Sequence, residues 1–318
     1  MKYHMNKTSV FVSSRNNYSL LEEFIERNKK DLSDYYFVNI DDFSDDEQVE
    51  LGKSICRKYN IPFVPNRARG LQNATLTMIQ HLQDVEIKSE YVLWMTHDSH
   101  TITPDFISRF DKVVSDGKLQ NFGVVGFNIL GPQCGVSNQS KVSPTQCGML
   151  GRSPLTKLPG RGGWYRTPDM ELPWSTWGGN RAIAVESPVD MTLAINVEMF
   201  KQHIDVSDQY HLFCAFDDIC LQFLKNGIYN VTLPFLQVWH DQHIKDGKVP
   251  VKSATAAKKG DSKHFGDYGP HFVKWESDWG WERDAVRKTF PLDKYPAGLI
   301  RDFYDHDYQL GPLRVFSL

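Results

Sequence analysis

The sequence lacks several features that would place it in a simple structural class. Its five cysteines are odd in number and show no Cys-x-x-Cys spacing, which argues against a disulfide scaffold or a cysteine zinc site. No stretch approaches about 18 consecutive apolar residues, and residues 1–9 contain no apolar signal core. There is also no internal repeat. These absences predict a cytoplasmic protein of a reducing compartment without a membrane span.

The composition is that of a folded globular protein. The 318 residues are 41% hydrophobic and 13% aromatic, which excludes low-complexity disorder and predicts two domains or one large α/β unit with extensions. The net charge of −3 excludes a polycation built to bind nucleic acid. However, residues 131–181 and 245–264 each carry six basic and two acidic side chains. These two segments are either solvated faces or loops that meet an anionic ligand.

The hydrophobic pattern alternates between strands and helices in the first third of the chain. Short apolar runs predict strands at residues 9–13, 35–40, 63–64 and Tyr91–Met95, and helical spacing predicts helices at residues 19–30, 49–59 and 71–82. This alternation predicts parallel strands with crossover helices, whose ligands bind at the carboxyl ends of the strands. Beyond an irregular stretch at 131–180, strands are expected at 182–185, 191–196 and 231–239, and a helix at 219–226.

Polar residues follow two of the apolar runs. The segment YVLWMTHDSH places Asp98 and His100 after a strand with one residue between them, so that both side chains can meet one cation. His240 follows the strand VTLPFLQVW and supplies a possible third ligand. One carboxylate and two imidazoles suit Mn²⁺ or Mg²⁺. An alternative grouping takes the two His-x-x-His pairs, 97/100 and 240/243, as a metallohydrolase site.

Six sequence blocks, in order, resemble the GT-A glycosyltransferases, particularly the family-2-like group. They are VFVSSRNN at 10–17, DDFSDD at 41–46, NRARGLQNA at 66–74, DSHTITPDFI at 98–107, VDMTLAINVEMF at 189–200 and DQYHLFCAFDDICLQFLKNG at 208–227. The Asp-Ser-His triplet resembles the Asp-x-His variant of the metal motif in polypeptide N-acetylgalactosaminyltransferases. The resemblance implies an α/β fold of the GT-A type, a Rossmann-like mixed sheet flanked by helices, with an irregular C-terminal extension.

The resemblance also implies the roles of particular residues. A nucleotide-diphosphate sugar, commonly a UDP-sugar, would be bound by residues of the first four blocks: Ser13, Arg15, Asp41, Asp42, Arg69 and Asp98. A divalent ion held by Asp98, His100 and His240 would stabilise the nucleotide leaving group.

Inverting members of the family use a carboxylate as the general base. The usual Glu-Asp pair aligns here with Ala215 and Phe216, so the base falls on Asp217 after a shift of one residue, with Asp218 beginning or capping the helix. Three residues are expected to contact the acceptor: Asp190, Trp174 and Trp177. A basic lid is expected to include Lys258 and Lys259.

These implications predict a metal-dependent glycosyltransferase with a catalytic domain at residues 1–245 and an extension or lid at 246–318. Residues 1–130 would bind the donor, and residues 131–245 the acceptor. The acceptor hydroxyl is left open between a glycan, a lipid-linked sugar, a protein and the hydroxymethylated bases of phage DNA. Two other functions remain: an inactive GT-A domain that binds nucleotide-sugar or glycan without turnover, and a sugar nucleotidyltransferase, for which the sequence shows no Gly-rich signature.

Overall fold

The computed structural model describes residues 6–97, 99–130, 149–152, 164–166, 181–185, 187–189, 191–207, 215–240, 304–305, 308–309 and 315–318. Its helices are α1 (Tyr18–Leu32), α2 (Asp46–Tyr59), α3 (Leu71–Asp84), α4 (Phe106–Ser115), α5 (Val197–His203) and α6 (Ala215–Lys225). Among these described residues, no helix is long and apolar enough to cross a membrane.

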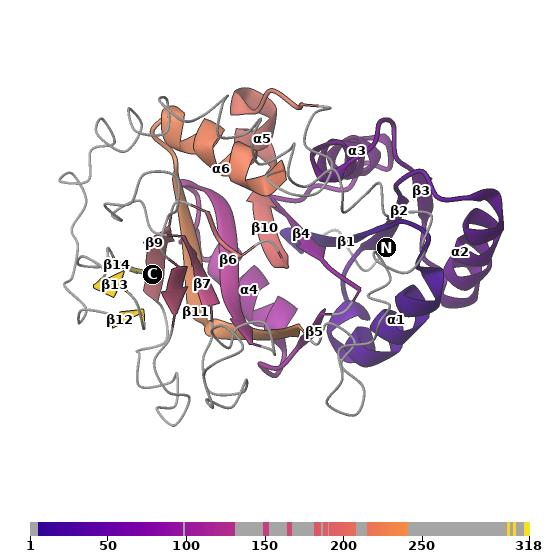
Figure 1. Ribbon diagram of the computed structural model, residues 1–318, viewed down its shortest axis with the longest axis horizontal. Coiled ribbons are helices and arrows are strands. Elements are labelled where there is room, and N and C mark those ends of the chain that lie inside the picture. Colours follow the sequence, from indigo (N-terminus) through magenta and orange to yellow (C-terminus); the bar gives the residue numbers. More distant parts are fainter. Residues whose placement is uncertain are drawn as a thin grey trace.

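The strands are β1 (Thr8–Ser14), β2 (Phe37–Asp41), β3 (Phe63–Pro65), β4 (Tyr91–Met95), β5 (Ser99–Thr101), β6 (Phe122–Leu130), β7 (Met149–Arg152), β8 (Trp164–Arg166), β9 (Arg181–Val185), β10 (Thr192–Asn196), β11 (Tyr229–His240), β12 (Tyr304–Asp305), β13 (Tyr308–Gln309) and β14 (Val315–Ser317). Nine of them form the main sheet in the order β14-β9-β11-β6-β10-β4-β1-β2-β3 (Figure 1). β5 adds to β11, and β7 and β8 extend from β6.

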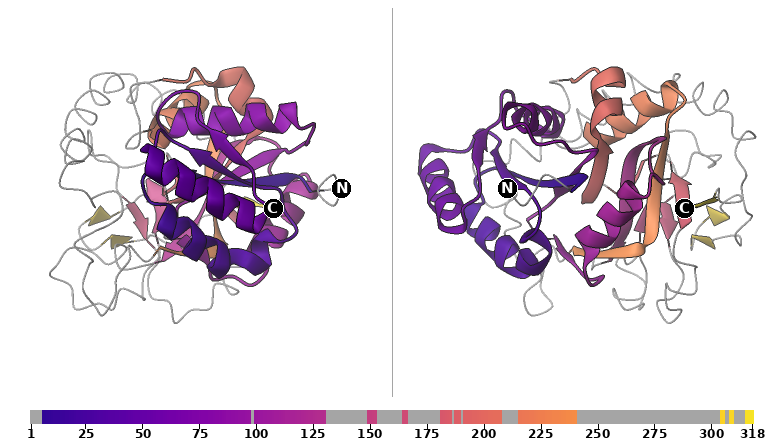
Figure 2. Two further views of the ribbon diagram at one scale, coloured as in Figure 1. Left: turned by 90° about the vertical axis from the view of Figure 1, so that its right-hand side faces the viewer. Right: turned by 180° about the vertical axis from the view of Figure 1, so that it is seen from behind.

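Helices cover both faces of this sheet. In Figure 1, α3, α5 and α6 lie above it and α1 and α4 below it, and Figure 2 shows the same layers from the side and from behind. The ring of Phe127 on β6 packs against Phe110 of α4 at 5.4 Å, whereas Trp94 on β4 packs against Phe216 of α6 at 4.7 Å. Because both faces are buried, β2 and β4 are apolar or buried at every position rather than alternating.

The directions of the strands decide where their ends meet. β1 pairs in parallel with β2 and β4, and β6 with β11, while β10 runs antiparallel between β4 and β6. β1, β2, β4, β6 and β11 therefore all point the same way and end at one edge of the sheet, which we call the carboxyl edge. The prediction of parallel strands, made for the first third of the chain, is correct for β1–β4. The strands β9 and β10, for which no direction was predicted, run antiparallel to their neighbours.

Several predicted elements have different limits in the structure. Helix α6 begins at Ala215, four residues before the predicted start, so Asp218 lies in its first turn and does not begin or cap it. Helix α4 was not predicted, although five of its apolar residues are buried at helical spacing. Strand β11 runs through His240, so this histidine is the last residue of the strand.

Candidate functional site

The carboxyl edge gathers most of the described residues that the sequence singled out. Ser13 lies near the end of β1, Asp41 ends β2, and His240 ends β11. Arg15 follows β1 directly, and Asp42 follows β2. Because ligands of open α/β sheets bind at this edge, its side chains form the candidate site.

A buried polar network joins the ends of β1, β2 and β4. The Ser14 hydroxyl donates to the Asn39 side-chain oxygen and lies 2.8 Å from Nε2 of His97, and Asn17 Nδ2 lies 3.2 Å from Nδ1 of the same ring. Since the Ser14 proton goes to Asn39, Nε2 of His97 must donate to Ser14, and Nδ1 accepts from Asn17. Both ring nitrogens thus make contacts within the fold. This arrangement does not support His97 as a ligand in the alternative metallohydrolase grouping.

Asp41 continues this network below the edge. The Tyr18 hydroxyl donates to Asp41 Oδ1 at 2.6 Å and accepts from Asn39 Nδ2 at 3.3 Å. Burial, reinforced by the hydrogen bond to Asp41, raises the pKa of Tyr18, so the phenol remains protonated and keeps donating. Tyr18 was not predicted to belong to the site, because a tyrosine at a helix start is indistinguishable in sequence from a core residue.

The carboxylate of Asp42 is hydrogen-bonded to the turn before α3. Its Oδ1 accepts from Asn66 Nδ2 at 2.9 Å and from the backbone N–H of Gly70 at 2.8 Å. Gly70 has φ 108°, which a residue with a side chain rarely adopts. Asp42 therefore holds the turn that carries Arg69, and its burial leaves 8% of the residue exposed.

Arg15 differs from Asp41 and Asp42 in its hydrogen bonding to the rest of the fold. The turn that carries it is tied to the 41–45 turn, because the Asn16 N–H donates to Ser44 Oγ and Asn16 Oδ1 accepts from the Asp45 N–H. The Nε and Nη1 atoms of Arg15 are buried and have no hydrogen-bond partner in the part of the chain that the structure describes. A guanidinium held in this way is a ready partner for an anion.

The three proposed metal ligands are only partly described, because Asp98 lies outside the described residues. In the β5–β11 ladder, His100 pairs with Trp239, and His240 pairs with Ser99. Residues that pair across two strands share a face of the sheet, whereas neighbours along one strand lie on opposite faces. His100 pairs with Trp239, the neighbour of His240, so the register by itself directs the two imidazoles to opposite faces. Among the described residues, no three His, Cys, Asp or Glu side chains form a group that could hold a metal. The donor types suit Mn²⁺, whereas convergence on one ion requires the strand ends to turn.

The two candidate base residues have different surroundings. Asp218 is 4% exposed, and its Oδ2 accepts from Nε2 of Gln72 and of Gln222, both at 2.8 Å. Gln72 Nε2 also donates to the Ala215 carbonyl, which fixes the start of α6 against the start of α3. Asp217, in the same turn, is half-buried. Asp218 thus has a clear packing role, and Asp217 is the more exposed of the two carboxylates.

The acceptor-side predictions fall mostly outside the described residues. Asp190, Trp174, Trp177, Lys258 and Lys259 all lie there, so their predicted roles remain predictions.

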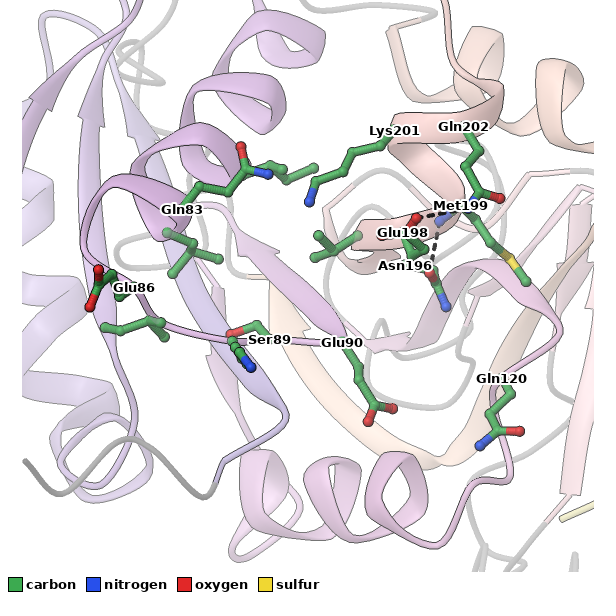
Figure 3. A pocket seen from close by; sticks show the side chains of 15 residues that line it. Gln83, Glu86, Ser89, Glu90, Gln120, Asn196, Glu198, Met199, Lys201 and Gln202 are labelled. Carbon is green, nitrogen blue, oxygen red and sulfur yellow. Dashed lines mark hydrogen bonds between the residues drawn. The ribbon is translucent and has the colours of Figure 1, made fainter.

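A cavity of about 960 Å³ opens at the opposite edge of the sheet (Figure 3). It lies between the end of α3, the turn before β4 and helix α5, and its rim carries polar side chains such as Gln83, Glu90, Gln120 and Lys201. None of the predicted site residues lines it. We therefore place the candidate site at the carboxyl edge, where the polar network lies, and not in this cavity.

The architecture defines the class of fold. No family model matches the chain, and no curated protein matches it in sequence. Among solved structures, the chain is similar to the crystal structure of GalNAc-T7 with UDP, GalNAc and Mn²⁺, with a TM-score of 0.52 and 14% identity over 90% of this chain. It is also similar to S. aureus TarS, with a TM-score of 0.43 and 13% identity over 74% of this chain and 36% of that one.

The likeness to GalNAc-T7 confirms the predicted fold class. The protein has the α/β GT-A fold, a mixed sheet between two layers of helices, and the assignment rests on the likeness to GalNAc-T7. The chain spans half of the length of that protein's chain.

Proposed function

We propose that this protein is a metal-dependent glycosyltransferase that moves a sugar from a nucleotide-diphosphate sugar, a UDP-sugar, to an acceptor hydroxyl. The observation that carries the proposal is Arg15, at the carboxyl edge of a GT-A sheet: two of its guanidinium nitrogens, Nε and Nη1, are buried without a hydrogen-bond partner among the described residues. A diphosphate brings the oxygens and the negative charge that such a group binds best. Ser13 and Asp41 lie at the ends of β1 and β2 at the same edge, Asp42 follows β2, and Arg69 lies on the turn before α3.

In this proposal, Asp98, His100 and His240 would hold Mn²⁺ or Mg²⁺, which requires the ends of β5 and β11 to turn so that the two imidazoles meet one ion. When bound, the ion supplies positive charge that offsets the charge of the departing diphosphate. The end of β11 brings His240 to the carboxyl edge, beside β5. That the similar GalNAc-T7 was crystallised with UDP and Mn²⁺ supports the choice of nucleotide and metal.

Asp217 is the general base of the proposed reaction, which inverts the anomeric centre. Its carboxylate takes the proton of the acceptor hydroxyl, whose oxygen forms the new bond to the anomeric carbon. The bond between that carbon and the diphosphate oxygen breaks, and the nucleotide diphosphate leaves with the electron pair. Asp218 keeps the turn in place through Gln72 and Gln222.

The test is to measure UDP release from a panel of UDP-sugars with Mn²⁺, with EDTA, and with candidate acceptors. Metal-dependent release from one donor is expected. The acceptors are glycans, lipid-linked sugars, peptides and hydroxymethylated DNA, and the one that raises the release names the substrate class. Binding of a donor without release or transfer would instead establish an inactive, nucleotide-sugar-binding domain. If no donor binds with or without metal, the proposal is wrong.

A pair of variants tests the base. Asp217→Asn is expected to lower transfer at least 100-fold at unchanged melting temperature, because a general base contributes about 10²–10⁴-fold. Asp218→Asn is the matched control, and its main effect should be on stability, since it disturbs the contacts with the two glutamines. Equal transfer by Asp217→Asn and the wild-type protein would exclude Asp217 as the base.

A further inference from the structure

One residue near the carboxyl edge has unused hydrogen-bonding capacity that the proposed mechanism does not explain. Asn128, on β6, is fully buried, and in the part of the chain that the structure describes neither its side-chain oxygen nor its nitrogen has a hydrogen-bond partner. Nearly all buried amides in proteins are paired, because an unpaired one loses its bonds to water and gains nothing in return. An amide left in this way keeps its donor and its acceptor available to a ligand.

The strand register places Asn128 on the face that α6 covers. Gly126 on β6 pairs with Leu193 on β10, and Leu193 pairs with Trp94 on β4, so these three positions share a face. Trp94 contacts Phe216 of α6. Asn128 lies two residues beyond Gly126 and therefore on the same face, one row closer to the carboxyl edge.

A second unpaired group and the proposed base lie on the same side of the sheet. The indole Nε1 of Trp94 is buried and, among the described residues, also has no hydrogen-bond acceptor. The start of α6, with Asp217 in its first turn, is held at the start of α3 by Gln72. Helix α3 starts just after β3 ends, so the start of α6 lies near the carboxyl edge as well. Asn128, Trp94 and Asp217 thus belong to one region.

Resting on the proposed function, we propose that Asn128 binds hydroxyl groups of a sugar at the reaction centre, with Trp94 as an additional donor. The amide oxygen accepts and the amide nitrogen donates, which matches a sugar hydroxyl, since each hydroxyl both donates and accepts. The sugar is either the one carried by the donor or the one that receives it. Asn128 is then a residue that determines sugar specificity, in a position that none of the six motif blocks includes.

The test compares the wild-type chain with Asn128→Leu, which keeps a similar size and removes both polar atoms. The affinities for UDP alone and for UDP-N-acetylgalactosamine, UDP-N-acetylglucosamine, UDP-glucose and UDP-galactose are measured by calorimetry with Mn²⁺. If Asn128 binds the donor sugar, the variant should bind UDP normally and the preferred UDP-sugar about tenfold more weakly. If it binds the acceptor sugar, donor affinity is unchanged and the KM for the acceptor rises by a similar factor.

Melting temperatures separate this role from a structural one. Asn128→Leu should melt at or above the wild-type temperature, because it removes an unpaired buried amide. Asn28→Leu is the matched control: Asn28 donates to the carbonyls of Phe24 and Ser99 and accepts from the Thr101 N–H, so its replacement should lower the melting temperature.

Two results would overturn the inference. One is Asn128→Leu with wild-type affinity for every UDP-sugar and a wild-type acceptor KM; the other is a loss of stability like that of Asn28→Leu, with binding unchanged. A wild-type protein that binds no UDP-sugar would instead refute the proposed function itself, and this inference with it.

Discussion

Replacement of Arg15 by methionine separates a binding role from a folding role. The guanidinium has two buried nitrogens without a hydrogen-bond partner among the described residues, so its removal breaks few contacts that stabilise the fold. Methionine keeps the apolar stem of the side chain. We therefore expect Arg15→Met to change the free energy of unfolding by no more than about 0.5 kcal/mol, the range of substitutions that disturb no specific feature.

The effect on nucleotide binding should be much larger. A hydrogen bond to a charged partner contributes about 1.5–3 kcal/mol, and 1.4 kcal/mol corresponds to a tenfold change in Kd. Arg15→Met should thus weaken UDP binding by about 10- to 150-fold. Calorimetric titration of UDP with Mn²⁺ measures the affinity, and thermal melting measures the stability of the same samples.

Arg27→Met is the control for the loss of one positive charge. Arg27 is exposed on α1 and makes a surface ion pair with Glu23 at 3.6 Å, which contributes little. Its replacement should leave UDP affinity unchanged. The reasoning about Arg15 would be refuted if both variants bound UDP as the wild type does, or if Arg15→Met lost more than about 1 kcal/mol of stability, which would mean that the guanidinium supports the fold.

Three further predictions concern the structure beneath the site. Gly52→Ala should destabilise the protein by about 1–3 kcal/mol in denaturant unfolding, because the added Cβ would lie 2.6 Å from Cζ of the buried Tyr18 ring; unchanged stability would show that the ring moves freely. Asp42→Ala should lower the free energy of unfolding by about 3 kcal/mol, because it leaves the Asn66 amide without its carboxylate partner. A decrease of less than about 0.5 kcal/mol would contradict this. Burial lowers the pKa of His81, so the unfolded chain binds more protons below pH 6.5, and stability should fall as the pH drops below that value. His81→Gln should flatten this part of the pH profile, and an unaltered profile would assign the effect to other groups.

The local pattern predicted the first half of the sheet well. The apolar runs VFV in β1 and YVLWM in β4 are continuous because both faces of these strands are buried, and this pattern is visible without any tertiary information. It did not reveal α4, although its buried residues Phe106, Ile107 and Phe110 have helical spacing, because the start of this helix falls within the block 98–107, which was compared only with a family motif. It also placed the start of α6 too late, since Asp217 and Asp218 resemble a helix cap.

The sequence by itself determined the fold class and the residue types of the candidate site. Ordered motif blocks, with acidic and basic residues directly after apolar strands, are local features, and they indicate a GT-A fold without any tertiary information. Only the tertiary structure decided which of these residues are committed to the fold, because hydrogen-bond partners come from distant parts of the chain. Gln72 reaches Asp218 over 146 positions, and Ser14 meets His97 over 83. The amide of Asn128, which has no hydrogen-bond partner among the described residues, is likewise a property of the packed sheet, since its burial exists only after folding.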